Sequence, residues 1–378
     1  MKQAIKKGAG IKSASVTIGD RRELLRKFKE KNGIEKAVEK EIQWLIMPDA
    51  YFEATKTHIP LGFCTRVRGK SNTGKSTIKL EIIKAAIRQG ILPVVFELEG
   101  NFSWSHAKEM GIEVEEIVDE ETGEITYGPG EDILYYDAAK LYELYGNYDH
   151  EHGKRLSKPN RDTYVIEDVA LCIRDLLAKQ REGELPIDMI FIIDSIGVGD
   201  CYRSAVAKSS NNMWFAGALS QSFNVIVNDL IPSSRNVKSP YLNTLFFVQK
   251  TWTQNTSMGL PRAMSKGGES LDWAVRMSIY LGGIESASVK ALTATSGGKD
   301  YKYGIKTKIQ IEKNHVSDIT YTGEICSTVH GLWDPNKLDQ YKKTYADEIK
   351  RKIAETNNIK LEEVTNVEYV ESEEEVAD

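Results

Sequence analysis

Apolar residues along this chain form short continuous runs that alternate with helical patterns. Runs with the length of buried strands lie at 63–68, 92–98, 133–136, 187–194 and 242–249. Between them, apolar residues recur every three or four positions at 76–90, 164–180 and about 212–230, which predicts amphipathic helices. Continuous apolar strands separated by helices are typical of a parallel sheet covered on both faces. The pattern therefore predicts an α/β fold with a mostly parallel central sheet.

The pattern changes towards both ends of the chain. Residues 20–46 are charged and helical in character, with a break at Asn32 and Gly33. Beyond residue 268, strand follows strand, which predicts antiparallel strands that extend the sheet at one edge. We expect a small helical subunit-contact element at 1–46, a core at 47–334 with a polar, Tyr-rich surface insertion at about 138–162, a C-terminal helix within 335–361, and an acidic disordered tail at 362–378.

The sequence "GKSNTGKST" at 69–77 fits the phosphate-binding pattern G-x-x-x-x-G-K-[ST]. A predicted strand precedes it and a predicted helix follows it, and this geometry aims backbone N–H groups and a helix N-terminus at phosphate. We therefore expect a nucleoside triphosphate to bind here. The residues expected to contact it are Gly69, Lys70, Ser71, Asn72, Thr73, Gly74, Lys75, Ser76 and Thr77.

Polar side chains follow three of the predicted strands. Asp194 ends the run "MIFIID", where a carboxylate can support a magnesium ion, although an aspartate here can also cap a helix. Glu97 and Glu99 follow "VVF", and strand alternation would point both to one side. One of them can orient the attacking water while the other forms a structural ion pair. The last of these strands is predicted to end at Gln249, which is placed to sense the γ-phosphate.

The formal net charge of −5 conceals an uneven distribution. The segment 362–378 holds eight acids and no base, so the rest of the chain carries +3. The segments 201–210 and 250–268 contain basic residues and no acid at all. Basic loops of this kind suit contact with a DNA backbone, and the alternative is a pair of loops without a ligand. The residues expected to contact DNA are Arg203, Lys208, Lys250, Trp252, Arg262 and Lys266, with Trp252 an equally good interface anchor.

Other features of the composition limit the class of protein. The chain is 41% hydrophobic and 28% charged, without an apolar run long enough to span a membrane. Its four cysteines lie far apart without a C-x-x-C motif, which suits a reducing cytoplasm. His150 and His152 have no nearby ligand partners, so they are predicted to be solvated loop residues.

Several segments, in this order, resemble the RecA family of recombination ATPases, and most of all a divergent bacteriophage-type member. They are "GKSNTGKST", "VVFELEGNFS", "IFIIDSIG", "LFFVQ", "SKGGESLDWAVRMSI" and "IQIEKN". The resemblance covers roughly residues 47–334. It implies a RecA-like ATPase core, with Gly267 and Gly268 closing a second DNA-binding loop.

The resemblance also implies roles for single residues. Lys75 would hold the β- and γ-phosphates, and Ser76 would ligate Mg²⁺. Asp194 would support that ion through water, and Glu99 would orient the attacking water. Gln249 would sense the γ-phosphate, and Lys313 would reach ATP across a filament interface. The sequence departs from the family pattern at His315, where the family has a second lysine, at Asp272, where it has a basic residue, and around Ser103 and His106, where it holds adenine.

The expected function is an ATP-dependent DNA strand-exchange recombinase, a DNA-dependent ATPase that forms helical filaments of itself on single-stranded DNA. Its expected cofactors are ATP and Mg²⁺. Its expected partners are single-stranded and duplex DNA, with single-strand-binding and mediator proteins, in the cytoplasm, or in the host cytoplasm if phage-encoded. The alternatives are a hexameric replicative-type helicase or other RecA-fold motor, and an ATP-binding filament or mediator protein without strand exchange.

Overall fold

The computed structural model describes residues 18–33, 38–209, 212–255, 261–265, 268–283 and 289–373. The chain divides into two compact units, residues 1–40 and residues 41–378. The first unit contains helix α1 (Ile18–Lys31), on which Leu24, Leu25 and Phe28 are exposed. Among the described residues, no helix is long and apolar enough to cross a membrane.

The prediction that helical structure continues to residue 46 is wrong for the described residues 38–46. Trp44–Leu45 form strand β1, which pairs with β2 (Ile59–Pro60) in the second unit. Leu45 is fully buried in the core of that unit, so its burial decides the local structure. The first unit therefore ends at Lys40 and not at residue 46.

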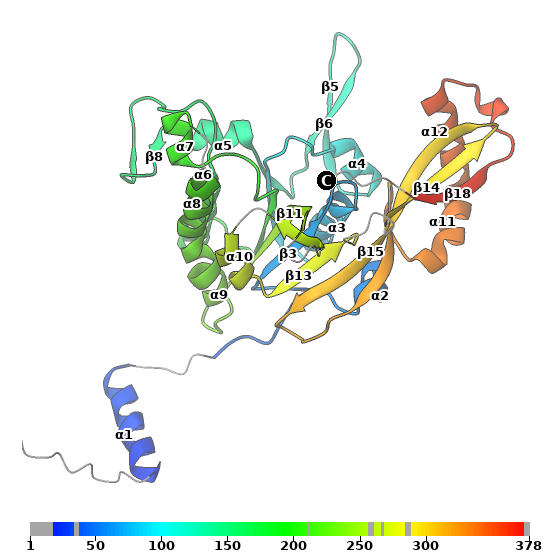
Figure 1. Cartoon of the computed structure of the whole chain (residues 1–378). Helices are drawn as coiled ribbons and strands as arrows, with labels where there is room; N and C mark the ends of the chain where they lie inside the picture. Colours follow the sequence, from blue (N-terminus) through cyan, green and yellow to red (C-terminus); the bar gives the residue numbers. More distant parts are fainter. Residues whose placement is uncertain are drawn as a thin grey trace, which may run out of the picture. The chain divides into compact units, whose positions relative to one another are not determined.

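A twelve-stranded mixed sheet forms the centre of the second unit (Figure 1). Adjacent strands run parallel in the order β13 (Met277–Leu281), β3 (Cys64–Gly69), β11 (Asn243–Asn255), β10 (Met189–Asp194), β4 (Leu92–Glu97) and β7 (Leu134–Asp137). This confirms the predicted α/β class with a parallel central part.

Antiparallel strands extend the sheet beyond β13. They are β15 (Lys299–Asn314), β16 (Thr322–Thr328) and β17 (Gly331–Trp333), with β14 (Val289–Ser296) paired to β15 and β18 (Glu368–Glu373) paired to β14. The extension at one edge is as predicted. The exception is β13, which lies parallel to β3 and antiparallel to β15.

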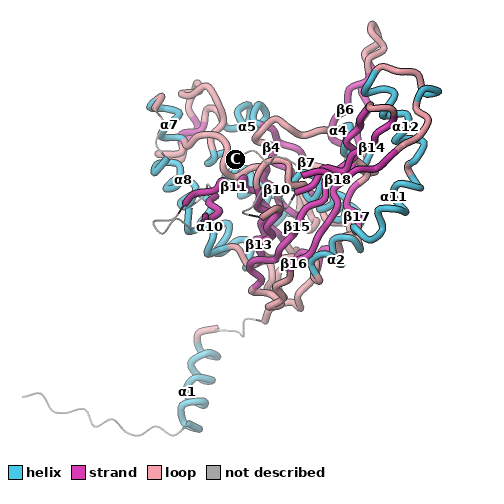
Figure 2. Tube along the Cα trace, turned by 45° about the vertical axis from the view of Figure 1, so that its right-hand side comes forward, coloured by secondary structure: helices cyan, strands magenta, loops and turns pink. Residues whose placement is uncertain are grey.

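Helices cover both faces of the sheet (Figure 2). Helices α2 (Asp49–Thr55) and α3 (Lys75–Arg88) contribute to the hydrophobic core on one face, and α6 (Ile166–Glu182) and α8 (Asn212–Val225) to the core on the other. Side chains of β10 alternate between these cores, with Ile192 in the first and Phe191 in the second. The shorter helices are α4 (Trp104–Glu109), α5 (Ala138–Tyr145), α7 (Tyr202–Ala207), a π-helical turn at Ile226–Leu230, α9 (Ile231–Ser233) and α10 (Gly268–Ala274).

The C-terminal region differs from prediction in two respects. The single helix expected there is two helices, α11 (Leu338–Thr344) and α12 (Ala346–Asn357). The tail predicted to be disordered includes strand β18, while residues 374–378 lie outside the described residues. The strand is stabilised because Tyr369 packs edge-on against Tyr303, with ring centroids 5.9 Å apart, and Lys306 lies 3.6 Å from Glu371. Apolar contacts and a basic neighbour thus offset the acidic composition.

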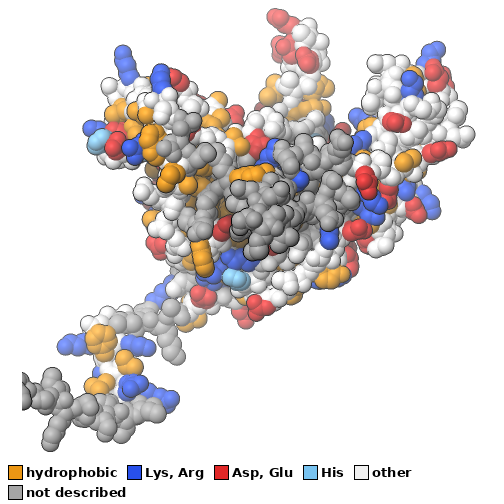
Figure 3. Space-filling view, in the orientation of Figure 1, with side chains coloured by type: hydrophobic (Ala, Val, Ile, Leu, Met, Phe, Trp, Pro, Cys, Tyr) orange, Lys and Arg blue, Asp and Glu red, His pale blue; other side chains and the backbone are white. Residues whose placement is uncertain are grey.

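The predicted insertion is also structured. Leu141 and Tyr145 of α5 are buried in the core beside α6, and the following residues form a small pair of strands, β8 (Tyr148–Asp149) and β9 (Lys154–Arg155). A different segment projects from the domain: the hairpin of β5 (Val114–Val118) and β6 (Ile125–Pro129), which the sequence analysis did not predict (Figure 1). Acidic side chains gather at its tip (Figure 3).

Candidate nucleotide site

The segment Gly69–Lys75 connects the carboxyl end of β3 to the first turn of α3. Both of its glycines are required by the local structure. A Cβ on Gly69 would lie 2.6 Å from the carbonyl oxygen of Leu281, and Gly74 has a φ of +93° with the Ser327 side chain against it. The Thr73 hydroxyl donates to the carbonyl oxygen of Lys70 at 2.9 Å. The loop is therefore fixed in a tight turn at the start of a helix, which suits an anion.

Lys75 folds back over this loop, and its Nζ donates to the same carbonyl oxygen of Lys70. The pKa of Lys75 is lowered to about 8, mainly because burial disfavours its charged form. Asp194 and Glu99 counteract that effect, and the charge of Lys250 adds to it. Lys250 is the register partner of Gly69 on the neighbouring strand β11. Two cationic side chains therefore converge on the phosphate loop.

Glu97 and Asp194 are register partners at the carboxyl ends of β4 and β10. Both bind Lys79, whose Nζ lies 2.9 Å from Glu97 Oε2 and 2.5 Å from Asp194 Oδ2. Burial raises the pKa of Glu97, and Lys79 counteracts that effect. Glu97 is thus a buried ion-pair partner, and Lys79, which sequence reasoning missed, is the cation that holds it.

Glu99 lies beyond the end of β4, so the expected strand alternation does not apply to it. It is an exposed residue, and its Oε1 accepts a hydrogen bond from the hydroxyl of Ser195. Ser195 follows Asp194 and is itself buried. Of the two glutamates, Glu99 is therefore the one held at the surface of the site, where it can reach a water molecule.

Gln249 is buried in the middle of β11, not at the end of a strand as predicted. Its Oε1 accepts from the guanidinium of Arg66 at 3.3 Å, and the same guanidinium binds the carboxylate of Asp272. Asp272 thus forms an ion pair within the chain. Arg66, another residue that sequence reasoning missed, links the candidate sensor to the surface helix α10.

Beyond Gln249, the predicted loop is largely a β-hairpin. Strand β11 continues to Asn255 and pairs with β12 (Pro261–Ser265), because the β-branched and aromatic residues that follow Gln249 favour a strand. Trp252 on this strand is 40% exposed. Arg262 lies on β12 and Gly268 begins α10, whereas Lys266 and Gly267 lie outside the described residues.

Part of the other predicted basic loop, at 201–210, is a helix. Arg203 is on α7, and its guanidinium lies 4.3 Å from the ring centroid of Trp214. Lys208 caps the same helix and lies 3.5 Å from Asp162 in an exposed ion pair. Both side chains remain at the surface, but an acid from the neighbouring insertion offsets the charge of Lys208.

Lys313 lies away from the phosphate loop of its own chain. It pairs with Ser278 of β13, which pairs in turn with Arg66 towards the amino end of β3. Its Nζ donates to the carbonyl oxygen of Asp272 at 2.8 Å. Burial, followed by the charges of Arg66 and Arg276, lowers the pKa of Lys313. His315 is exposed near it. The structure does not bring Lys313 together with Lys75 within one chain.

The remaining candidate residues have structural contacts. His150 is partly buried and lies 2.6 Å from Asp168, so the prediction of a solvated residue is wrong for it, while His152 is exposed beside Asp149. Among the described residues, no cluster of three metal-binding side chains occurs. Ser103 caps α4 by accepting from the backbone N–H of His106.

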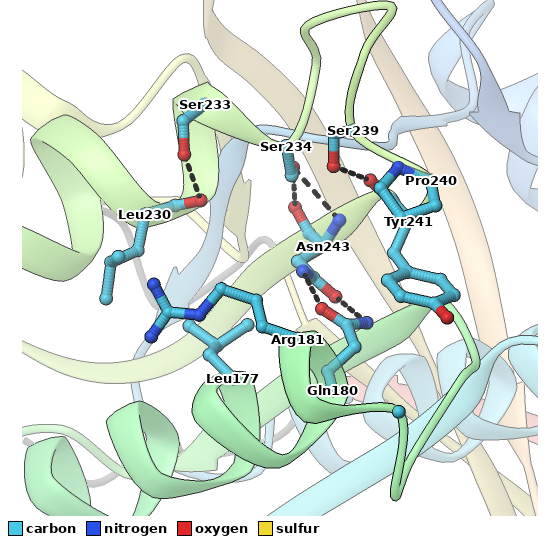
Figure 4. A pocket seen from close by; sticks show the side chains of 11 residues that line it. Leu177, Gln180, Arg181, Leu230, Ser233, Ser234, Ser239, Pro240, Tyr241 and Asn243 are labelled. Carbon is cyan, nitrogen blue, oxygen red and sulfur yellow. Dashed lines mark hydrogen bonds between the residues drawn. The ribbon is translucent and has the colours of Figure 1, made fainter.

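A cavity of about 280 Å³ lies between α6 and the segment before β11 (Figure 4). Gln180 and Asn243 bind each other in its wall through two amide hydrogen bonds of 2.7 and 3.0 Å. Asn243 is the first residue of β11, so the cavity is at the amino edge of the sheet. It is therefore at the opposite edge from the phosphate loop and is not the nucleotide site.

Triphosphate binding should take up a proton near pH 8. A bound phosphate stabilises the charged form of Lys75 and so raises its pKa from about 8 towards or above the ordinary 10.5. Between pH 8 and the raised pKa, the complex holds a proton on Lys75 that the free protein lacks. The affinity for the triphosphate should therefore fall by up to about tenfold per pH unit above 8. Calorimetry in buffers of different ionisation enthalpy measures this uptake. Equal affinity and no uptake across the window would show that Lys75 is already charged.

Comparison with known proteins gives no family for the chain. No protein-family model matches it, and no curated protein matches it with significant similarity. What the site can bind and do is therefore argued from its own residues.

Proposed function

We propose that the chain is an ATP-dependent DNA strand-exchange recombinase with a RecA-like core, which forms filaments on single-stranded DNA. One observation carries the proposal. The strand that holds Gln249 beside the phosphate loop runs without interruption into a hairpin with an exposed tryptophan. The candidate γ-phosphate sensor and a candidate DNA-contacting element thus lie on one strand, which connects them directly.

The nucleotide half of the proposal depends on charge and position. The backbone N–H groups of the loop and the N-terminus of α3 bind the phosphates, and Lys75 neutralises the terminal ones. Glu99, held by Ser195, orients the attacking water. Gln249 is hydrogen-bonded to Arg66, and Arg66 binds Asp272 of α10. A movement of Gln249 in response to the γ-phosphate can therefore be transmitted to α10.

The residues present also fit Mg²⁺. Ser76 is an exposed hydroxyl on the first turn of α3, and Asp194 is a carboxylate at the end of β10. A hydroxyl and one carboxylate suit this ion, which usually keeps several waters and takes its other ligands from substrate phosphates. When bound, the ion would neutralise charge on the phosphates. Ser76 and Asp194 would hold it in place.

The DNA half depends on the hairpin and the surface around it. Trp252 has the exposure needed to stack on a base, and Lys250 supplies positive charge beside it. Arg203 adds an exposed guanidinium on α7. The interactions expected here are sequence-independent, because stacking and phosphate contacts need no base-specific hydrogen bond.

The two alternatives differ in what they require. A hexameric helicase would be expected to place an arginine near the last strands to act on a neighbouring nucleotide. The segment 308–315 offers Lys313 and His315 instead, which favours a recombinase. A mediator that binds ATP only as a structural ligand would not need Glu99 and Ser76 together.

Arg262→Ala combined with Lys266→Ala should weaken binding to single-stranded DNA without affecting ATP binding. Two lost phosphate contacts should make the salt dependence shallower by about 1.4 in log–log slope, at roughly 0.7 per contact. Stimulation of the ATPase by DNA should also fall, because the hairpin continues the strand that carries Gln249. A salt titration of affinity, with ATPase assays with and without DNA, measures both effects.

The matched control removes two charges from another hairpin. Lys299→Ala combined with Lys302→Ala, at the turn between β14 and β15, changes the net charge equally. It should leave the salt slope and the stimulation unchanged. If both double variants behave alike, general electrostatics explains DNA binding and the hairpin has no special role.

A further inference from the structure

Lys79 lies one turn beyond Lys75 on the same face of α3, since residues four apart are neighbours on a helix. The two lysines differ in surroundings. Lys75 is partly exposed at the loop, whereas the side chain of Lys79 is only 4% exposed. A lysine this deeply buried needs compensation for its charge.

The compensation comes from three sides. Glu97 and Asp194 each bind Nζ, and the same nitrogen lies 4.7 Å from the ring centroid of Phe102. The side chain is therefore a charged ammonium ion enclosed by two carboxylates and an aromatic face.

This position is chemically a cation site. Two carboxylates at the ends of adjacent parallel strands repel each other and attract a cation. Oxygen ligands of this kind bind divalent cations such as Mg²⁺ and Mn²⁺. One of the two, Asp194, is also the residue proposed above to support Mg²⁺ beside Ser76.

We propose that Lys79 is a built-in counter-ion that fills the position between Glu97 and Asp194 and so keeps a divalent cation out of it. The proposal goes beyond the proposed function and depends on it only for the role of Asp194. Lys79 acts here as a positioning residue: it holds both carboxylates in place and prevents the nucleotide-free protein from binding metal.

The test measures Mn²⁺ binding to nucleotide-free protein by the electron paramagnetic resonance of free Mn²⁺. Wild-type protein should show no site at this position. Lys79→Gln removes the charge and should create one Mn²⁺ site, with an affinity at least about tenfold above any binding by wild type, a gain of about 1.4 kcal/mol. Lys79→Arg keeps the charge and should again show no site.

A second substitution locates the new site. In Lys79→Gln combined with Glu97→Gln, one of the two carboxylates is neutral, and the gained Mn²⁺ binding should be lost. If the wild-type protein binds Mn²⁺ as tightly as Lys79→Gln, or if folded Lys79→Gln gains no site, Lys79 is not a counter-ion that excludes metal.

Removal of the buried ammonium group can also impair folding. Lys79→Met is therefore a second neutral variant, to be used if Lys79→Gln does not fold. Methionine fills similar volume against Phe102 without charge. If both neutral variants are unfolded, circular dichroism with added Mn²⁺ decides. Recovery of structure by Mn²⁺ supports the proposal, and its absence overturns it. Neither DNA nor nucleotide takes part, so a failed recombinase assignment and a failed counter-ion proposal give different results.

Discussion

Lys75→Ala should reduce ATP hydrolysis by more than about a hundredfold, since loss of one preorganised electrostatic contact to a reacting group commonly has that effect. The structure gives the reason. Lys75 is anchored by its hydrogen bond to the carbonyl oxygen of Lys70, directly over the loop that would hold the phosphates. ATPase assays with and without single-stranded DNA, together with binding of a fluorescent ATP analogue, measure the loss.

Arg88→Ala is the matched control for this variant. Arg88 is an exposed basic residue in the last turn of the same helix, far from the phosphate loop. Its removal should leave turnover unchanged. Hydrolysis at the wild-type rate in Lys75→Ala would contradict the assignment of the nucleotide site.

Glu99→Gln should slow ATP turnover by about a hundredfold or more while ATP and DNA still bind, because a positioned general base typically contributes that much. Glutamine keeps the size of the side chain and can still accept from Ser195, so the geometry should persist. Single-turnover kinetics separates the slow chemical step from binding.

Glu97→Gln is the comparison that makes this result specific. Glu97 is 1% exposed and bound to Lys79, so its substitution should reduce thermal stability more than it changes the chemical step. A slow chemical step in Glu97→Gln with normal turnover in Glu99→Gln would mean that the two carboxylates have the opposite roles.

The sequence predicted the parts of the fold in which local pattern and burial agree. The short, continuous apolar run "MIFIID" predicted a buried strand, and it is β10. The glycine loop, its flanking strand and α3 followed from one motif. The placement of Glu97 and Asp194 side by side was predictable because the carboxyl ends of parallel strands meet at one edge of a sheet.

The errors arose where composition concealed a pattern. Residues 368–373 combine three acids with Tyr369 and Val370, which favour strands, but the prediction gave more weight to the acidic composition. The turn between β5 and β6 lies within a similar acidic stretch. Strand β11 continues past Gln249 because Thr251 and Trp252 favour strands. This continuation could have been predicted from the sequence.

Lys79 was missed for a different reason. Helix periodicity predicts which positions face the core, and a lysine at such a position is normally taken to extend into solvent. The signal was the combination of Glu97 and Asp194 at neighbouring strand ends with a lysine one turn after Lys75. Only the register of β4 with β10 brings these three residues together.

Electron microscopy of the wild-type protein with single-stranded DNA and a slowly hydrolysed ATP analogue tests the central claim most directly. The proposed function predicts open helical filaments that require both DNA and nucleotide. Closed rings would contradict it in favour of a helicase-type motor. Particles that form no ordered assembly under these conditions would also contradict it, since strand exchange by this mechanism needs the filament.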